Sequence, residues 1–168
     1  HPRIKKDAES FSIKPNMPDY TEMCRTFSWD AIRNELLGSA RSESLNIAQL
    51  AVDRHAGDRP TQVALRCLGK TGKTLELTFG DLAEQTNRFA NSLRKLGVGK
   101  GERVFVLAGR IPELYIAALG TLKNGSVFCP LFSAFGPEPI RHRLAIGDAR
   151  VLVTTQQLYE KKVRGIRN

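Results

Sequence analysis

The centre of the chain reads Arg103-Val104-Phe105-Val106-Leu107, and two similar runs follow it, Val127-Phe128-Cys129-Pro130-Leu131 and Val151-Leu152-Val153. Each run is apolar almost throughout and does not alternate with polar residues, which is typical of strands buried on both faces of a parallel sheet. The segments between the runs have helical spacing, and they open with Pro112 and Pro137 at the first-turn position that proline favours. The sequence therefore predicts an α/β fold with a mainly parallel sheet covered by helices.

The part of the chain before this alternation has a different character. Residues 1–44 are polar and include one short helical segment, 29–37, with Ser28 at its N-cap position, so we expect an N-terminal extension. Residues 45–168 are expected to form one α/β subdomain. Its first helix is expected over residues 45–55, with an apolar face made of Ile47, Leu50 and Ala51.

Two further elements connect this helix to the central strands. Residues 63–68 and 74–77 read as strands joined by a tight turn, which predicts a β-hairpin. Thr78 and Asp81 have the spacing of a capping box at the start of a long helix, where Glu84 and Arg88 are spaced to pair. The complete prediction is a flavodoxin- or Rossmann-like three-layer half-domain, preceded by a helical extension and a β-hairpin.

Composition argues against several classes of function. The 168 residues are 41% hydrophobic and contain no apolar stretch of about 18 residues, so no membrane partner is expected. The net charge is +9, but the basic residues are dispersed and no aromatic residues interleave with them, so no nucleic-acid partner is expected. Cys24, Cys67 and Cys129 are far apart and form no CxxC pair, which favours free thiols in a cytoplasmic protein and predicts no metal site.

Ligands of open α/β sheets bind beyond the carboxyl ends of the strands. Three segments follow the predicted strands there: Ala108-Gly109-Arg110, Phe132-Ser133-Ala134-Phe135 and Thr154-Thr155. Each is small or polar and would let a ligand approach the backbone, although short loops in any α/β protein have this character. A Walker loop is excluded at Gly72-Lys73-Thr74, because its first glycine is required at Cys67 and a strand, not a helix, follows.

A family resemblance rests on two motifs. Leu77-Thr78-Phe79-Gly80-Asp81-Leu82 and, about forty residues later, the run from Leu122 to Leu131 resemble the first two core motifs of the adenylate-forming enzymes. Further matching segments are Phe27-Ser28-Trp29, Gly101-Glu102-Arg103-Val104, Pro112-Glu113-Leu114-Tyr115 and Arg150-Val151-Leu152-Val153-Thr154. Their order over about residues 20–160 is similar to the N-terminal portion of AMP-forming acetyl-CoA synthetases and related short-chain acyl-CoA ligases.

This resemblance implies an enzyme that activates acetate or another short acid with ATP and Mg²⁺, and then transfers the acyl group from acyl-AMP to CoA. Residues 45–168 would be the first subdomain, ending before the ATP-binding loop, so no catalytic residue is carried over and the isolated chain is expected to be inactive. Self-association through an exposed sheet is also expected. The alternatives are a longer-chain acyl-CoA or peptide-synthetase relative, and a non-catalytic short form that acts as a binding module.

The resemblance also implies a CoA contact. In acetyl-CoA synthetases the segment after the second motif, typically Phe-Gly-Gly-Phe, lies near CoA, and here Phe132, Ser133 and Ala134 align with its first three residues, with Ser and Ala replacing the glycines. Lys161 and Arg164 are weaker candidates for the CoA phosphate, and a solvated basic tail that includes Lys162 is the competing interpretation. Lys123 and Arg110 are expected to serve helix ends and the surface.

Overall fold

The computed structural model describes residues 12–13, 17, 19–37, 45–69 and 71–166, so most of the extension before residue 19 and the segment 38–44 lie outside the described part. The chain separates into two units, His1–Glu43 and Ser44–Asn168, and each is described by itself. Within the described ranges, every helix is too short or too polar to cross a bilayer.

The first unit contains two short helices, α1 (Tyr20–Thr26) and α2 (Trp29–Leu37). Helix α2 begins where the sequence predicts, and the Ser28 hydroxyl accepts a hydrogen bond from the Ala31 N–H at 3.4 Å. Helix α1 was not predicted. It is capped by Asp19, whose carboxylate accepts from the Glu22 N–H at 3.0 Å. Seven residues are too few for a periodic apolar pattern to stand out.

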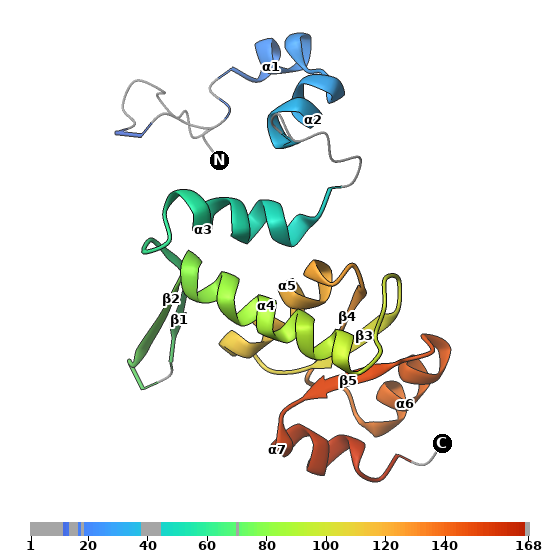
Figure 1. The fold of residues 1–168 in the computed structure, drawn as a ribbon. Coiled ribbons are helices and arrows are strands. Elements are labelled where there is room, and N and C mark those ends of the chain that lie inside the picture. Colours follow the sequence, from blue (N-terminus) through green and yellow to red (C-terminus); the bar gives the residue numbers. More distant parts are fainter. Residues whose placement is uncertain (1–11, 14–16, 18, 38–44, 70, 167–168) are drawn as a thin grey trace, which may run out of the picture. The chain divides into compact units, whose positions relative to one another are not determined.

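The second unit carries the sheet (Figure 1). Its elements in chain order are η2 (Gln49–Asp53), α3 (Arg54–Asp58), β1 (Val63–Leu68), β2 (Thr74–Thr78), α4 (Phe79–Lys95), β3 (Arg103–Leu107), α5 (Pro112–Lys123), β4 (Val127–Leu131), α6 (Pro137–Ile146), β5 (Val151–Thr154), α7 (Gln156–Leu158) and η3 (Tyr159–Val163), where η marks a π-helical turn. Strands β1 and β2 form an antiparallel hairpin, and β4, β3 and β5 form a parallel sheet in that order.

The central strand β3 divides the core into two layers. Val104 and Val106 face one core, in which they pack with side chains of α4 and α5 such as Leu93 and Ala117. Phe105 and Leu107 face the other core, where Ile140 of α6 is fully buried and the α7–η3 segment contributes Leu158 and Val163. Helices therefore cover both faces of the sheet, and the predicted three-layer α/β fold is confirmed.

Helix α4 begins with the predicted capping box. The Asp81 N–H donates to the Thr78 hydroxyl at 3.1 Å, and the Thr78 N–H donates to the Asp81 carboxylate at 2.9 Å. The Thr78 hydroxyl also donates to this carboxylate, and these hydrogen bonds hold the pKa of Asp81 below its ordinary value because they favour the charged form. On the exposed side, Arg88 and Glu84 pair as the spacing predicts.

The first helical segment of this unit differs from the prediction. It continues to Asp58 and winds as a π-helical turn at η2, where the Arg54 N–H donates to the Gln49 carbonyl. The predicted apolar face is wrong, because Ile47 is 63% exposed while Ala48 and Val52 are buried. Ala48 and Val52 are four residues apart, a spacing that an α-helix also keeps on one face. The prediction therefore chose the wrong face of this segment.

Helices α4 and α5 approach each other closely at Gly120. A Cβ atom added to Gly120 would lie 2.8 Å from Cδ1 of Phe89 and 3.0 Å from the carbonyl oxygen of Thr86. Neither atom belongs to the loose end of a flexible side chain, so the two helices would have to separate to admit it. The absence of a side chain at this position therefore sets the spacing of the layer that covers one face of the sheet.

We expect Gly120→Ala to lower the free energy of unfolding by roughly 1–3 kcal/mol, because the extra methyl group overpacks the α4–α5 contact. Gly57→Ala is the matched control, since Gly57 also lies in a helix and an added Cβ meets nothing within 4 Å. That change should raise stability by roughly 0.5–1 kcal/mol. Denaturant unfolding measures both values, and an equal effect of the two changes would contradict the close approach.

Candidate functional site

The three loops that the sequence singles out meet at the carboxyl edge of the parallel sheet. Leu107 of β3 pairs with Leu131 of β4 and with Thr154 of β5, so the strands end level with one another. One residue from each following segment lines a hollow of about 380 Å³: Gly109, Ser133 and Thr155. The remaining lining residues are Ile111 and, from α7 and η3, Gln157, Leu158, Lys161 and Lys162.

The middle loop, residues 132–136, is a tight turn between β4 and α6. The Phe135 N–H donates to the Phe132 carbonyl at 3.0 Å, and the two rings meet edge to face with their centroids 5.7 Å apart. The Arg143 guanidinium lies over the Phe135 ring at 4.2 Å, a cation–π contact that packs the turn against α6. Phe132 and Ala134 are exposed and Ser133 is half-buried, so only Ser133 of the three aligned residues lines the hollow.

The basic residues after β5 have separate roles. Lys161 is exposed and lines the hollow. Lys162 is half-buried, and its ammonium group donates to the carbonyl oxygens of Ser133 at 2.5 Å and Phe135 at 2.8 Å. Arg164 lies outside the lining, and its guanidinium pairs with Glu160 one turn away at 2.7 Å. The interpretation of Lys162 as part of a solvated tail is therefore wrong.

The electrostatic character of this hollow follows from its lining. Two lysine side chains line it, and none of the eight lining residues is acidic. Hydroxyl and amide groups of Ser133, Thr155 and Gln157 add polar contacts, although the Thr155 hydroxyl already accepts the Leu158 N–H at 3.3 Å as the cap of α7. Such a lining favours a ligand that carries negative charge and hydrogen-bonding groups.

A second hollow, of about 670 Å³, has a different character. Its lining includes Phe89, Val106, Ile116 and Val153 and is mostly apolar, with Glu113 at its margin. Thr154 also lines it, and the Thr154 hydroxyl is buried without a hydrogen-bond partner among the described residues. This hollow lies against β5, which pairs only with β3 within the described part of the chain.

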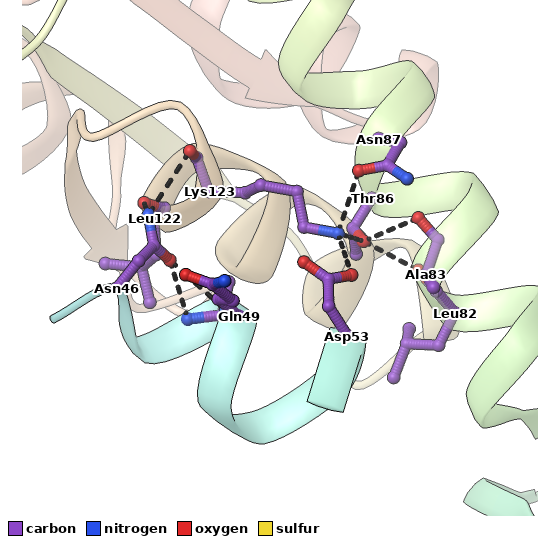
Figure 2. A network of polar contacts seen from close by, with 10 residues as sticks. Asn46, Gln49, Asp53, Leu82, Ala83, Thr86, Asn87, Leu122 and Lys123 are labelled. Atoms are coloured by element: carbon purple, nitrogen blue, oxygen red, sulfur yellow. Dashed lines mark hydrogen bonds and ion pairs between the residues drawn. The ribbon is translucent and has the colours of Figure 1, made fainter. Parts of the chain in front are cut away.

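Lys123 at the end of α5 has a structural role that the sequence does not reveal. Only 11% of its side chain is exposed, and its ammonium group donates to Asp53 Oδ1 at 2.7 Å, Thr86 Oγ1 at 2.9 Å and Asn87 Oδ1 at 3.0 Å (Figure 2). An ammonium group has three donors, and all three are used here. The expectation that Lys123 serves the surface is therefore wrong, because it joins η2, α4 and α5.

The Asn46 side chain strengthens the same junction. Its amide group donates to the carbonyls of Leu122 and Lys123 at 3.1 and 3.3 Å, and its oxygen accepts from the Ala48 N–H at 3.0 Å (Figure 2). The carbonyls at the end of α5 are thereby satisfied by the residue that begins the first helical segment. The polar groups of this cluster bind one another, so the cluster acts as a structural junction.

The half-buried Cys129 thiol is not activated. Burial raises its pKa above the ordinary value, and the nearby Arg103 charge opposes this only in part. The thiol is therefore a weak nucleophile at neutral pH. The described residues also contain no group of three or more His, Cys, Asp or Glu side chains that could hold a metal ion.

The fold and the hollow first define the class of protein: an α/β protein with an open sheet and a lysine-lined hollow at the carboxyl edge of its strands. The family follows from comparison with known proteins. The sequence profile of the AMP-binding enzyme family matches residues 52–167, and the chain belongs to that family. The resemblance that the two core motifs carry is thereby confirmed.

The relatives are acyl-CoA synthetases. The chain is 40% identical to "Acetyl-coenzyme A synthetase" of Bacillus subtilis over 149 residues, which are 87% of this chain and 26% of that protein. The crystal structure of an acyl-CoA synthetase from Brucella canis superposes with a TM-score of 0.75 at 32% identity, covering 84% of this chain and 26% of that chain. A benzoate CoA ligase from Burkholderia xenovorans matches with a TM-score of 0.62 at 27% identity, covering 70% and 23%.

The chain thus spans 26% or less of the length of the curated acetyl-coenzyme A synthetases that head the comparison. The two solved structures are likewise matched over about a quarter of their length. About three quarters of each of those longer proteins therefore lies outside the matched part.

The Lys123 junction predicts a large effect of one substitution. Lys123→Met should lower the free energy of unfolding by roughly 1.5–3 kcal/mol, because it leaves the Asp53 carboxylate and the Thr86 hydroxyl without their donor. Arg88→Met removes an exposed cation from a pair with Glu84 and should cost no more than about 0.5 kcal/mol.

Chemical denaturation of both variants and of Asp53→Asn, completed to a double-mutant cycle with Lys123→Met, measures the coupling directly. A Lys123→Met variant as stable as Arg88→Met would show that the ammonium group contributes nothing to the junction.

Proposed function

We propose that this chain supplies the first α/β unit of an AMP-forming ligase that joins acetate or another short carboxylic acid to CoA. In such a reaction the carboxylate attacks the α-phosphorus of ATP, giving acyl-AMP and pyrophosphate. The CoA thiol then attacks the acyl carbon and AMP leaves. The observation that carries the proposal is the 132–136 turn, which follows the second core motif and borders a positively charged hollow.

The proposed role of this unit is to receive part of CoA. CoA has a polar, hydrogen-bonding pantetheine arm and an anionic nucleotide, which suit a lining of lysine, hydroxyl and amide groups. We assign the CoA contact to Phe132, Ser133 and Ala134, and a contact with a CoA phosphate to Lys161, whose exposed side chain lines the hollow. Arg164 supports the assignment less, because Glu160 already engages its guanidinium.

Adenylation needs groups that this chain does not supply. The sequence has no glycine-rich phosphate loop that leads into a helix, and we assign no catalytic residue to it. Among the described residues, no three His, Cys, Asp or Glu side chains come together as a site for the Mg²⁺ ion that the family implies. We therefore propose that ATP and Mg²⁺ bind elsewhere in the ligase, and that the isolated chain is inactive.

Acetate is the preferred acid because the first relatives are acetyl-coenzyme A synthetases. A longer-chain acyl-CoA or peptide-synthetase relative is the nearest alternative, and a non-catalytic binding module is the more distant one. A cytoplasmic location fits the three cysteines, which are all free thiols.

The ligase proposal is tested by a chimera in which this chain replaces the matching segment of the Bacillus subtilis relative. We expect the chimera to form acetyl-CoA from acetate, ATP and CoA, because the chain would restore the missing unit. The isolated chain should release no pyrophosphate when it is given acetate and ATP.

The unaltered Bacillus subtilis relative is the control for assay and expression. The ligase proposal would be wrong if the chimera has the circular dichroism spectrum of a folded protein but forms no acyl-CoA with acetate, propionate or longer acids. Acetate-dependent pyrophosphate release by the isolated chain would instead show that the unit is active alone.

We also propose that the isolated chain self-associates. One edge of β5 has no partner strand among the described residues, and an apolar hollow lies beside it; both expose groups that favour contact with another chain. Light scattering over a range of concentrations should show a mass above 18.7 kDa that rises with concentration. A monodisperse species of that mass at high concentration would contradict the proposal.

A further inference from the structure

Among the described residues, Lys162 is the one side chain outside the 132–136 turn that forms hydrogen bonds with its backbone. Besides its own Phe135–Phe132 hydrogen bond, its backbone accepts two hydrogen bonds from the Lys162 ammonium group, one at Ser133 and one at Phe135. Hydrogen bonds from a charged donor are stronger than those between neutral groups. The two acceptors lie on either side of Ala134, so one ammonium group fixes the peptide units on both sides of the exposed tip of the turn.

Packing of its helical segment fixes the position of Lys162. Lys162 lies in the π-helical turn η3, where the Arg164 N–H donates to the Tyr159 carbonyl at 2.9 Å. Leu158 and Val163, five residues apart, both pack into the core beneath the sheet. The wider π turn brings these two residues to one face, and π turns are often found at functional sites. Lys162, between them in sequence, reaches the carbonyls of the turn from this anchored segment.

The neighbouring Lys161 makes the role of Lys162 clearer. Both side chains line the same hollow, but Lys161 is exposed whereas Lys162 is half-buried and is bound to two carbonyl oxygens. A lysine whose only role is to attract an anion keeps its ammonium group in solvent. The ammonium group of Lys162 instead binds two backbone carbonyl oxygens. Lys162 therefore differs from Lys161 in what it contacts, although the two have the same charge and lie side by side in the sequence.

We propose that Lys162 is a positioning residue that fixes the 132–136 turn in the shape required for the CoA pantetheine arm to pass. This inference rests on the proposed function, in which the turn contacts CoA. The turn carries Ser133 and Ala134 where relatives typically have glycines, so small movements of its backbone change the width of the path. When the turn already has its bound conformation, CoA binding does not have to overcome the entropy loss of ordering it.

The first test measures the turn in the full chain, without any ligand. Lys162→Met should speed hydrogen exchange of the Phe135 amide about tenfold, because two hydrogen bonds that hold the turn are lost. Lys161→Met, the matched control, should leave this rate within about twofold, and the amides of β3 should stay protected in both variants. An unchanged Phe135 rate in Lys162→Met would overturn the proposal.

A second variant guards against a folding failure. Lys162→Gln keeps a polar end in the half-buried position but is shorter and uncharged, so it should speed exchange as Lys162→Met does. If Lys162→Met does not fold, Lys162→Gln decides the outcome by the same criterion, and an unchanged rate overturns the proposal.

The second test uses the chimera with the Bacillus subtilis relative and separates the two half-reactions. Lys162→Met should raise KM for CoA about tenfold and leave acetate-dependent ATP–pyrophosphate exchange within about twofold, because adenylation does not use the turn. A merely structural role would reduce both half-reactions together and would overturn the positioning role. Arg88→Met, which removes an exposed cation that does not line the hollow, should leave KM for CoA within about twofold. An equal rise in KM with Arg88→Met would show that loss of any positive charge has this effect, and would also overturn the positioning role.

The experiments distinguish a failure of the ligase proposal from a failure of the proposed role of Lys162. If the unaltered chimera uses no CoA, the ligase proposal fails, and the positioning role in CoA binding fails with it. The hydrogen-exchange result then still reports whether Lys162 holds the turn.

Discussion

The structure depends on the register of β3 between its two parallel neighbours. Pairing of Leu107 with both Leu131 and Thr154 makes the three strands end level, so the segments after them meet at one edge of the sheet. The alternation of side chains along β3 then supplies both cores, and each core holds the helices that carry the strand ends in place. The hollow that Gly109, Ser133 and Thr155 line is a consequence of this register and not of any single motif.

Two lysines connect distant parts of this framework in the same physical way. Lys123 and Lys162 each bring an ammonium group out of bulk water, and each gives it several oxygen acceptors that offset the loss of hydration. Lys123 joins helices, whereas Lys162 joins a helical turn to a loop. Several exposed arginines instead pair with nearby acids, as Arg88 does with Glu84, and these pairs contribute little to stability. Part of the positive charge of the chain is therefore engaged by groups of the protein itself.

Membership of the AMP-binding enzyme family gives these features a functional context. The chain covers only about a quarter of the length of the relatives that it matches. In the proposed ligase, this unit and the segments that hold ATP would act on different half-reactions. Because of that division, a change in the 132–136 turn should slow thioester formation and leave the rate of adenylation unchanged. The adenylation rate is then the internal control.

Local chemistry in the sequence determined the strands, the hairpin, the capping box at Thr78 and Asp81 and the helices that open at Pro112 and Pro137, because each depends on residues close together in the chain. It also located the three loops at the carboxyl edge. The π turns at η2 and η3 were missed, since their spacing departs from the α-helical period. Only the tertiary structure decided the roles of Lys123 and Lys162, whose partners Asp53 and Ser133 lie 70 and 29 residues away. A basic residue far from its acceptors in sequence looks like surface charge until helix packing and strand register bring them together.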